Sequence, residues 1–269
     1  MVFRPGTRRP PAGPGLDRSP SRPGPLSRPL RVVRPPAGTP SARTHGSRDA
    51  SSSATIHALL RRVRSLRPEL PAQCAFLDQN RPSLRDALYQ LRSERPILVP
   101  LLLSTGYHVR VDIPAAVAAA GLPTSQAARA LGPHPLLAEA LAARLAETGA
   151  TPEAPVVLAG AGSSDPTAIA DTARMAHLLA RHLGRPVTPA HLSAAGPTPH
   201  EAVAALRAAG HHDVAVATYL LAPGFFTRRA ATTEARWTSP PLAAHDAIAR
   251  LILHRYDEAR TSTALPLAA

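Results

Sequence analysis

The chain has 269 residues, enough for one large domain or two of ordinary size, and 44% of them are hydrophobic but only 3% aromatic, so its core must consist mainly of Ala, Leu and Val. No stretch approaches the roughly 18 consecutive apolar residues of a membrane span, and a single cysteine, Cys74, excludes an intramolecular disulfide and any cysteine-rich metal centre. We therefore expect a soluble, cytoplasmic protein that does not enter membranes.

The net charge of +13 is concentrated at the amino terminus. Residues 1–43 contain nine arginines and one acid, a charge of +8, which leaves only +5 for the other 226 residues. The segment is rich in Pro, Arg, Gly and Ser and has no apolar h-region, so we expect a disordered tail and no secretory signal. It is a targeting or binding tail, or else the product of a misassigned start or an out-of-frame translation, and we favour the last. No pattern of stacking aromatic residues accompanies the arginines, so we expect no nucleic-acid binding.

Helical and strand-like patterns alternate from residue 51 to about residue 258. The expected helices lie at about 51–66, 82–91, 113–120, 135–147, 166–183, 199–209 and 244–258. The expected strands lie at about 72–78, 96–104, 155–160, 187–192 and 213–221. Such alternation predicts right-handed βαβ units, and therefore an α/β fold with small parallel sheets flanked by helices.

The two halves of this region resemble each other. "THGSRD" matches "GAGSSD", "FLDQNRPS" matches "HLSAAGPT", "LLLSTGYHVR" matches "YLLAPGFFTR", and "LGPHPLL" matches "LAAHDAI", in the same order and at nearly constant spacing. We therefore expect a duplicated domain over 44–150 and 151–260, with a flexible carboxyl terminus at 261–269. The matches pair His45 with Ala161, Asp78 with Ser193, His108 with Phe226, and His134 with His245.

Three polar residues occur in the first half only. His45, Asp78 and His108 follow predicted strands, and the carboxyl ends of parallel strands form the edge where open sheets build their sites. Two imidazoles and a carboxylate suit Fe²⁺, Co²⁺, Ni²⁺ or Zn²⁺ better than Mg²⁺ or Ca²⁺. The alternative is that each histidine only caps a strand or bonds to a loop carbonyl, but their joint placement favours a metal site that the second half has lost.

Other candidate sites are weaker. His134 and His245 recur at helix starts in both halves, which indicates a structural role, and His211 and His212 fall in an exposed turn. "GAGSSD" lacks the third glycine of a dinucleotide-binding fingerprint. The sequence around His45 has no Gly-x-Ser-x-Gly elbow, which argues against a serine hydrolase.

The segments "HGSRD", "FLDQNRPSL", "PLLLSTGYHVRVDIP" and "GAGSSDP" resemble the sirohydrochlorin chelatases of siroheme and cobalamin biosynthesis, in their tandem-domain bacterial form. The resemblance covers residues 44 to about 258. It implies that His45 and His108 bind a divalent metal and promote its insertion into a tetrapyrrole, and that Asp78 stands where the family usually has glutamate. It also implies that the metal, Fe²⁺ or Co²⁺, is a substrate, and that no cofactor is permanently bound.

Sirohydrochlorin carries acetate and propionate groups, so arginines near the strand ends are candidate carboxylate ligands. These arginines are Arg48, Arg110, Arg228 and Arg229. The chain departs from the family in one respect besides Asp78: the segment before His45 reads "GTPSART" (38–44), where relatives have an apolar strand. This leaves open a second interpretation, a non-catalytic tetrapyrrole or metal-binding protein derived from a chelatase.

Overall fold

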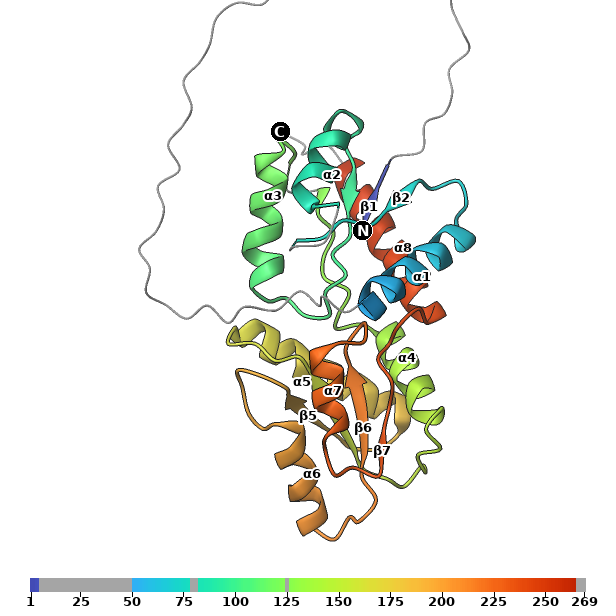
Figure 1. Cartoon of the computed structure of the whole chain (residues 1–269), viewed down its shortest axis with the longest axis vertical. Coiled ribbons are helices and arrows are strands. Elements are labelled where there is room, and N and C mark those ends of the chain that lie inside the picture. The colour runs from blue at the N-terminus through green and yellow to red at the C-terminus, as the bar shows by residue number, and fades with distance from the viewer. Residues whose placement is uncertain (5–49, 78–81, 124–125, 265–269) are drawn as a thin grey trace, which may run out of the picture. The chain divides into compact units, whose positions relative to one another are not determined.

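The structure is a computed structural model and describes residues 1–4, 50–77, 82–123 and 126–264. Two small β-sheets, each covered by helices, form the α/β architecture expected from the sequence (Figure 1). None of the helices in these ranges combines the length and the apolar character needed to cross a bilayer. Most of the expected tail, residues 5–43, lies outside the described residues.

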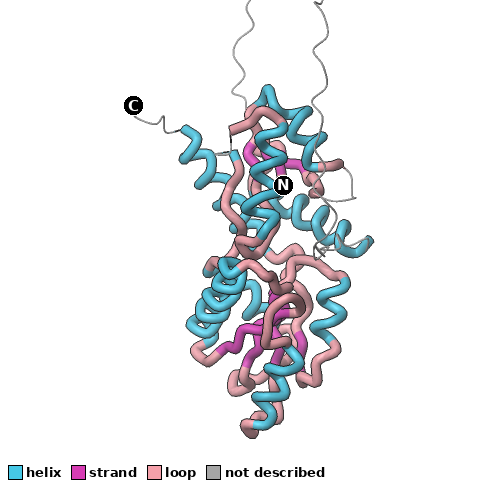
Figure 2. Tube along the Cα trace, turned by 90° about the vertical axis from the view of Figure 1, so that its left-hand side faces the viewer, coloured by secondary structure: helices cyan, strands magenta, loops and turns pink. Residues whose placement is uncertain are grey.

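The second repeat is built on a fully parallel four-stranded sheet. Figure 2 shows its strands in magenta with helices around them. Its elements are β4 (Val156–Gly160), α5 (Pro166–Leu183), β5 (Val187–His191), α6 (Pro199–Ala208), β6 (Ala215–Tyr219), α7 (Phe225–Ala231), β7 (Trp237–Thr238) and α8 (Asp246–Ala264). The strand order is β5-β4-β6-β7, and β4 is buried along its whole length, as a strand covered on both faces should be. The starts of α5 and α6 agree with the prediction because proline follows a capping residue: Asp165 caps α5 and Thr198 caps α6.

The first repeat has shorter strands. Its elements are α1 (Ala50–Leu66), β2 (Ala72–Gln73), α2 (Leu84–Leu91), the 3-10 turn η1 (Arg92–Glu94), β3 (Ile97–Leu98), the π-helical turn η2 (His108–Asp112), α3 (Ile113–Ala119) and α4 (Pro135–Ala146). The strand expected over 96–104 is paired in a sheet only at β3. Further along, the carbonyl of Leu102 accepts a hydrogen bond from the amide of Leu131 at 2.8 Å, so the rest of this apolar run is held by a loop.

The amino terminus of the chain supplies the central strand of the first sheet. β1 (Val2–Phe3) lies between β2 and β3 and runs antiparallel to both. Val2 packs on one face in a cluster with Leu88 of α2, and Phe3 packs on the other face against Tyr256 of α8, with ring centroids 4.9 Å apart. The expected disordered tail over 1–43 is therefore wrong for its first residues. This sheet also contains antiparallel pairs where we expected parallel ones.

The position of β1 has a physical reason. β2 and β3 run in the same direction and would leave a gap one strand wide, with unpaired backbone groups and two open apolar faces. Val2 and Phe3 are strand-forming residues, and both are fully buried in this gap. Backbone hydrogen bonds extend the pairing at each end, from the Arg4 amide to Pro71 at 3.0 Å and from the Val99 amide to Met1 at 2.8 Å.

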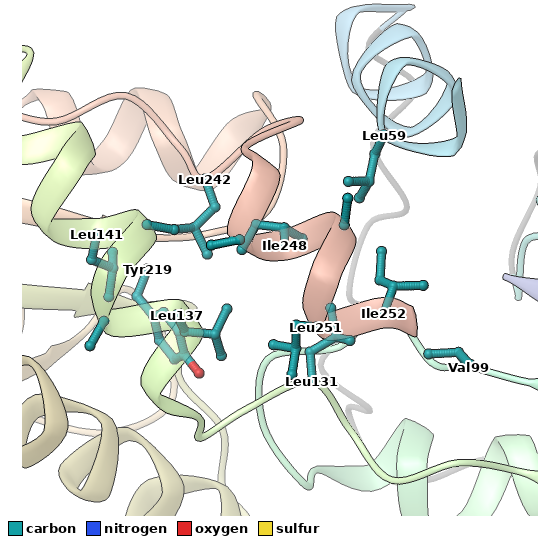
Figure 3. Close-up of a cluster of buried hydrophobic side chains, with 14 of the residues drawn as sticks. Leu59, Val99, Leu131, Leu137, Leu141, Tyr219, Leu242, Ile248, Leu251 and Ile252 are labelled. Carbon is teal, nitrogen blue, oxygen red and sulfur yellow. The ribbon is translucent and has the colours of Figure 1, made fainter. Parts of the chain in front are cut away.

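The last helix of each repeat packs on the other repeat. α4 contacts α5 and β6, whereas α8 contacts α1 and β3. Figure 3 shows Ile248 and Ile252 of α8 near Leu59 of α1, and Leu137 of α4 near Tyr219 of β6. The expected boundary near residue 150 thus separates two sequence repeats that exchange their final helices. α8 also continues to Ala264, so 261–264 is helical where we expected a flexible terminus, and 265–269 lies outside the described residues.

The two recurring histidines are helix caps, which confirms their predicted structural role. The Nδ1 atom of His134 accepts a hydrogen bond from the Leu136 amide at 3.2 Å, and that of His245 accepts one from the Ala247 amide at 3.2 Å. Burial, reinforced by the positive charge of Arg255, lowers the pKa of His134 to about 4. His134 is therefore a neutral acceptor at neutral pH.

This pKa predicts an acid-sensitive contribution to stability. The unfolded chain protonates His134 near pH 6.5 and the folded chain only near pH 4, so stability should be lost as the pH falls between these values. Asparagine caps helices without titrating. The free energy of unfolding should therefore fall by about 1 kcal/mol less in His134→Asn than in the unaltered protein when the pH is lowered from 7 to 4.5. This figure includes a reduction for solvent screening, because His134 is only half-buried. Urea unfolding at both pH values checks this, and parallel losses would contradict it.

Candidate functional site

The structure describes four of the seven predicted site residues. His108, Arg110, Arg228 and Arg229 are described, whereas His45, Arg48 and Asp78 lie outside the described residues. Among the described residues, no three His, Cys, Asp or Glu side chains form a group that could hold a metal ion. The geometry of the site is therefore built from His108 and its surroundings.

His108 is oriented by a carboxylate one helical turn further along the chain. Its Nδ1 atom lies 2.6 Å from Oδ2 of Asp112, and the two side chains are 29% and 36% exposed. Because the ionised carboxylate only accepts hydrogen bonds, Nδ1 carries the proton and the lone pair of the neutral ring is on Nε2. Metal-binding histidines commonly have this arrangement, in which an outer carboxylate fixes the tautomer and raises the basicity of the ligating nitrogen.

The local backbone explains this pairing. The apolar run that begins at β3 ends at Gly106, whose carbonyl accepts hydrogen bonds from the amides of Val109 and Arg110 at 3.0 and 3.2 Å. The chain thereby enters η2, which places residues four apart on one face. The spacing of His108 and Asp112 is visible in the sequence, but Asp112 was not among the predicted site residues. Asp112 could have been identified from its position four residues after His108, the spacing at which side chains on a helix lie on one face.

A cavity of about 310 Å³ lies beside Asp112. Its lining residues are Leu77, Ser83, Leu84, Arg85, Asp112 and Ala116. Leu77 and Asp112 therefore line the same cavity, while Asp78, the next residue after Leu77, lies outside the described residues. Arg85 adds an exposed positive charge that the sequence analysis did not select.

The predicted arginines have different environments. Arg110 is 57% exposed, and its Nη1 donates to Oδ2 of Asp165 in the second repeat at 3.1 Å. Hydrogen bonding from the Thr167 amide, with a smaller contribution from Arg110, lowers the pKa of Asp165 and keeps it ionised. Arg228 and Arg229 are exposed on α7, after β6. Arg110 thus has an anionic partner within the protein.

The corresponding edge of the second repeat shows where such positions meet. Ser193, the counterpart of Asp78, donates from its hydroxyl to the carbonyl of Ala161, the counterpart of His45, at 2.8 Å. Phe226, the counterpart of His108, packs with Ala161 against the same apolar cluster. The counterparts of Asp78 and His45 therefore meet in the second repeat, where Ala and Phe replace both imidazoles.

A sequence model of the CbiX family matches residues 42–148 and again residues 155–259. The chain belongs to the CbiX family. The double match agrees with the internal repeat, and it confirms the tandem-domain resemblance inferred from the sequence motifs. No curated protein matches the chain.

Several solved structures share the fold of this chain. SirB from Bacillus subtilis with Fe³⁺ is 24% identical, with a TM-score of 0.67 over 81% of this chain and 94% of that one. The sirohydrochlorin chelatase SirB from Bacillus subtilis subspecies spizizenii in complex with cobalt is 21% identical, with a TM-score of 0.58 over 80% and 92%. DR2241 from Deinococcus radiodurans, a multi-domain protein with structural similarity to chelatases, is 20% identical, with a TM-score of 0.55 over 80% and 54%. At these identities the likeness establishes the fold.

Proposed function

We propose that this protein is a sirohydrochlorin chelatase that inserts a divalent metal, Fe²⁺ or Co²⁺, into a tetrapyrrole in the cytoplasm. Membership of the CbiX family and the tandem fold shared with SirB support the class of reaction. The observation that carries the proposal is the pairing of His108 with Asp112, which prepares an imidazole for metal binding in the repeat that retains the polar residues. Fe²⁺ is placed slightly ahead of Co²⁺, and comparing insertion rates for the two ions tests this order.

The proposed residues divide the chemistry between them. Metal insertion requires two pyrrole N–H protons to leave the ring while the metal is delivered. His45 and His108 are proposed to bind the metal as neutral imidazoles, and either can accept a pyrrole proton as a general base. Asp78 holds the metal or takes up a proton. Ser193 and Ala161 are in contact in the second repeat, which supports a matching closeness of Asp78 and His45 in the first.

The arginines serve the acidic side chains of the macrocycle. Arg48, Arg228 and Arg229 are proposed to bind acetate and propionate groups through paired hydrogen bonds. Arg110 joins them by exchanging Asp165 for a substrate carboxylate, since its ion pair is exposed and therefore weak.

The direct test is metal insertion by purified protein. Sirohydrochlorin mixed with Fe²⁺ or Co²⁺ should change its absorption spectrum faster with the protein than without it. His45→Ala and His108→Ala should each slow the catalysed rate by more than about 100-fold, because losing a ligand costs more than losing the group that orients it. His212→Ala is the matched control, since His212 is exposed in a distant turn of the second repeat. Unchanged rates in both site variants would rule out the assigned roles.

A second candidate is a non-catalytic tetrapyrrole or metal-binding protein. It is favoured by β1, because Val2 and Phe3 occupy the central position that a strand leading directly into His45 would take. This candidate predicts that sirohydrochlorin or Co²⁺ binds stoichiometrically while the insertion rate stays at the spontaneous value.

A further inference from the structure

The second repeat contributes a nearly buried acid to the segment that carries His108. Asp171 of α5 is only 3% exposed, and its Oδ2 accepts a hydrogen bond from the backbone amide of Thr105 at 2.8 Å. Its other oxygen accepts a hydrogen bond from Arg174 at 3.2 Å. Burying a carboxylate is costly unless it is paired, so a fold would not keep one here without a compensating interaction.

The bond to Thr105 is one of two anchors on the same segment. Tyr219 at the end of β6 donates from its hydroxyl to the carbonyl of Leu103 at 2.6 Å. Burial, together with the charge of Asp171, raises the pKa of Tyr219, so the hydroxyl remains a donor. The second repeat therefore holds two backbone groups just before Gly106. Asp171 of α5 binds the amide of Thr105, and Tyr219 of β6 binds the carbonyl of Leu103.

These anchors act at the point where the orientation of His108 is set. Gly106 starts the turn that leads into η2, and Thr105 directly precedes it. A Cβ added at Gly106 would lie 3.8 Å from the hydroxyl of Ser163 and 3.9 Å from Cβ of Ala168, so the turn lies against the first part of α5 and the loop before it. A shift of this turn would move His108 and Asp112 together.

We propose that Asp171 is a positioning residue that holds the His108 segment in its metal-binding geometry. The second repeat has lost the polar residues of the site, but it has kept this acid as a support for the site of the first repeat. The effect of Asp171 on catalysis rests on the proposed function. Its effect on the position of the His108 segment does not, and that effect can be measured without any substrate.

The first measurement is hydrogen–deuterium exchange of residues 103–110 in the full chain. Asp171→Ala should speed exchange of this segment by about 10-fold or more, because a charge-assisted hydrogen bond is lost. Asp171→Asn keeps an acceptor oxygen and should stay within about threefold of the unaltered protein. Arg174→Ala is the matched control: it removes the other partner of Asp171, keeps the bond to Thr105, and should leave exchange unchanged.

The second measurement is binding of Co²⁺ alone, followed by its absorption spectrum. The Co²⁺ dissociation constant should rise about 10-fold in Asp171→Ala, and much less in Asp171→Asn. If the protein inserts metal, Asp171→Ala should lower kcat by a similar factor with little change in KM for sirohydrochlorin, which separates misplacement of His108 from loss of substrate binding.

The outcomes separate the two proposals. Unchanged exchange, or faster exchange with unaltered Co²⁺ affinity, overturns the role of Asp171. An unaltered protein that binds Co²⁺ but inserts no metal overturns the proposed function and leaves the anchoring to be decided by exchange and affinity. If Asp171→Ala does not fold, Tyr219→Phe removes the neighbouring anchor and keeps the ring, and it should change both measurements in the same direction.

Discussion

Replacing Asp112 with alanine is expected to slow metal insertion about 10- to 100-fold, because outer partners of metal-binding histidines typically contribute this much. Without the carboxylate, Nδ1 of His108 loses its acceptor at 2.6 Å, and the ring loses both its fixed tautomer and its orientation. Asp112→Asn should have a smaller effect, since an amide oxygen still accepts the hydrogen bond but carries no charge. Initial rates of insertion into sirohydrochlorin give the comparison.

Asp213→Ala provides a matched control for this prediction. Asp213 forms an exposed ion pair with Arg236 in the second repeat, at 2.7 Å, and its removal should leave the insertion rate unchanged. An equal effect of the two substitutions would indicate a general charge effect. An Asp112→Ala protein with the normal rate would show that the carboxylate does not orient a catalytic ring.

Replacing Phe3 with alanine is expected to lower the free energy of unfolding by about 3–5 kcal/mol, as for other fully buried aromatic side chains. Phe3 is 0% exposed and packs against Tyr256, so truncation would leave a cavity between β1 and α8. A dispensable tail would show no such loss. Urea denaturation followed by circular dichroism measures the change.

Phe225→Ala is the matched control, because it makes the same truncation at an exposed position. Phe225 is 60% exposed at the start of α7, and its truncation should cost less than about 1 kcal/mol. Equal midpoints for Phe3→Ala and the unaltered protein would mean that β1 does not hold the first sheet together in solution.

The sequence was most informative in the second repeat. β4 is a continuous apolar run, and α5 and α6 begin with proline after a capping residue, so local signals agree with the fold there. The short elements α7 and β7 were not predicted. β1 could not be predicted in this way. Val2 and Phe3 form too short a pattern for periodicity, and their partners Ala72 and Ile97 lie far along the chain.

The candidate site was predictable to the extent that it depends on strand ends. His108 was selected because it follows an apolar run, and its role as a metal ligand stays a prediction. The structure adds the carboxylate of Asp112, which orients its ring. Asp171 was beyond reach, because nothing local distinguishes an acid within an amphipathic helix from a solvated one. Only the packing of α5 against the Thr105 segment gives it a role.

The exchanged helices bear on how a duplicated gene of this kind can evolve. Leu59 of α1, in the first repeat, packs against α8 of the second repeat. The sheet of the second repeat, which includes Tyr219, packs against α4 of the first repeat, so each half stabilises the other. A polypeptide cut near residue 150 would give two fragments that each carry an orphan helix and lack a needed one. Fission would therefore be selected against, and each copy would persist as an obligate folding partner of the other, whatever became of its own site.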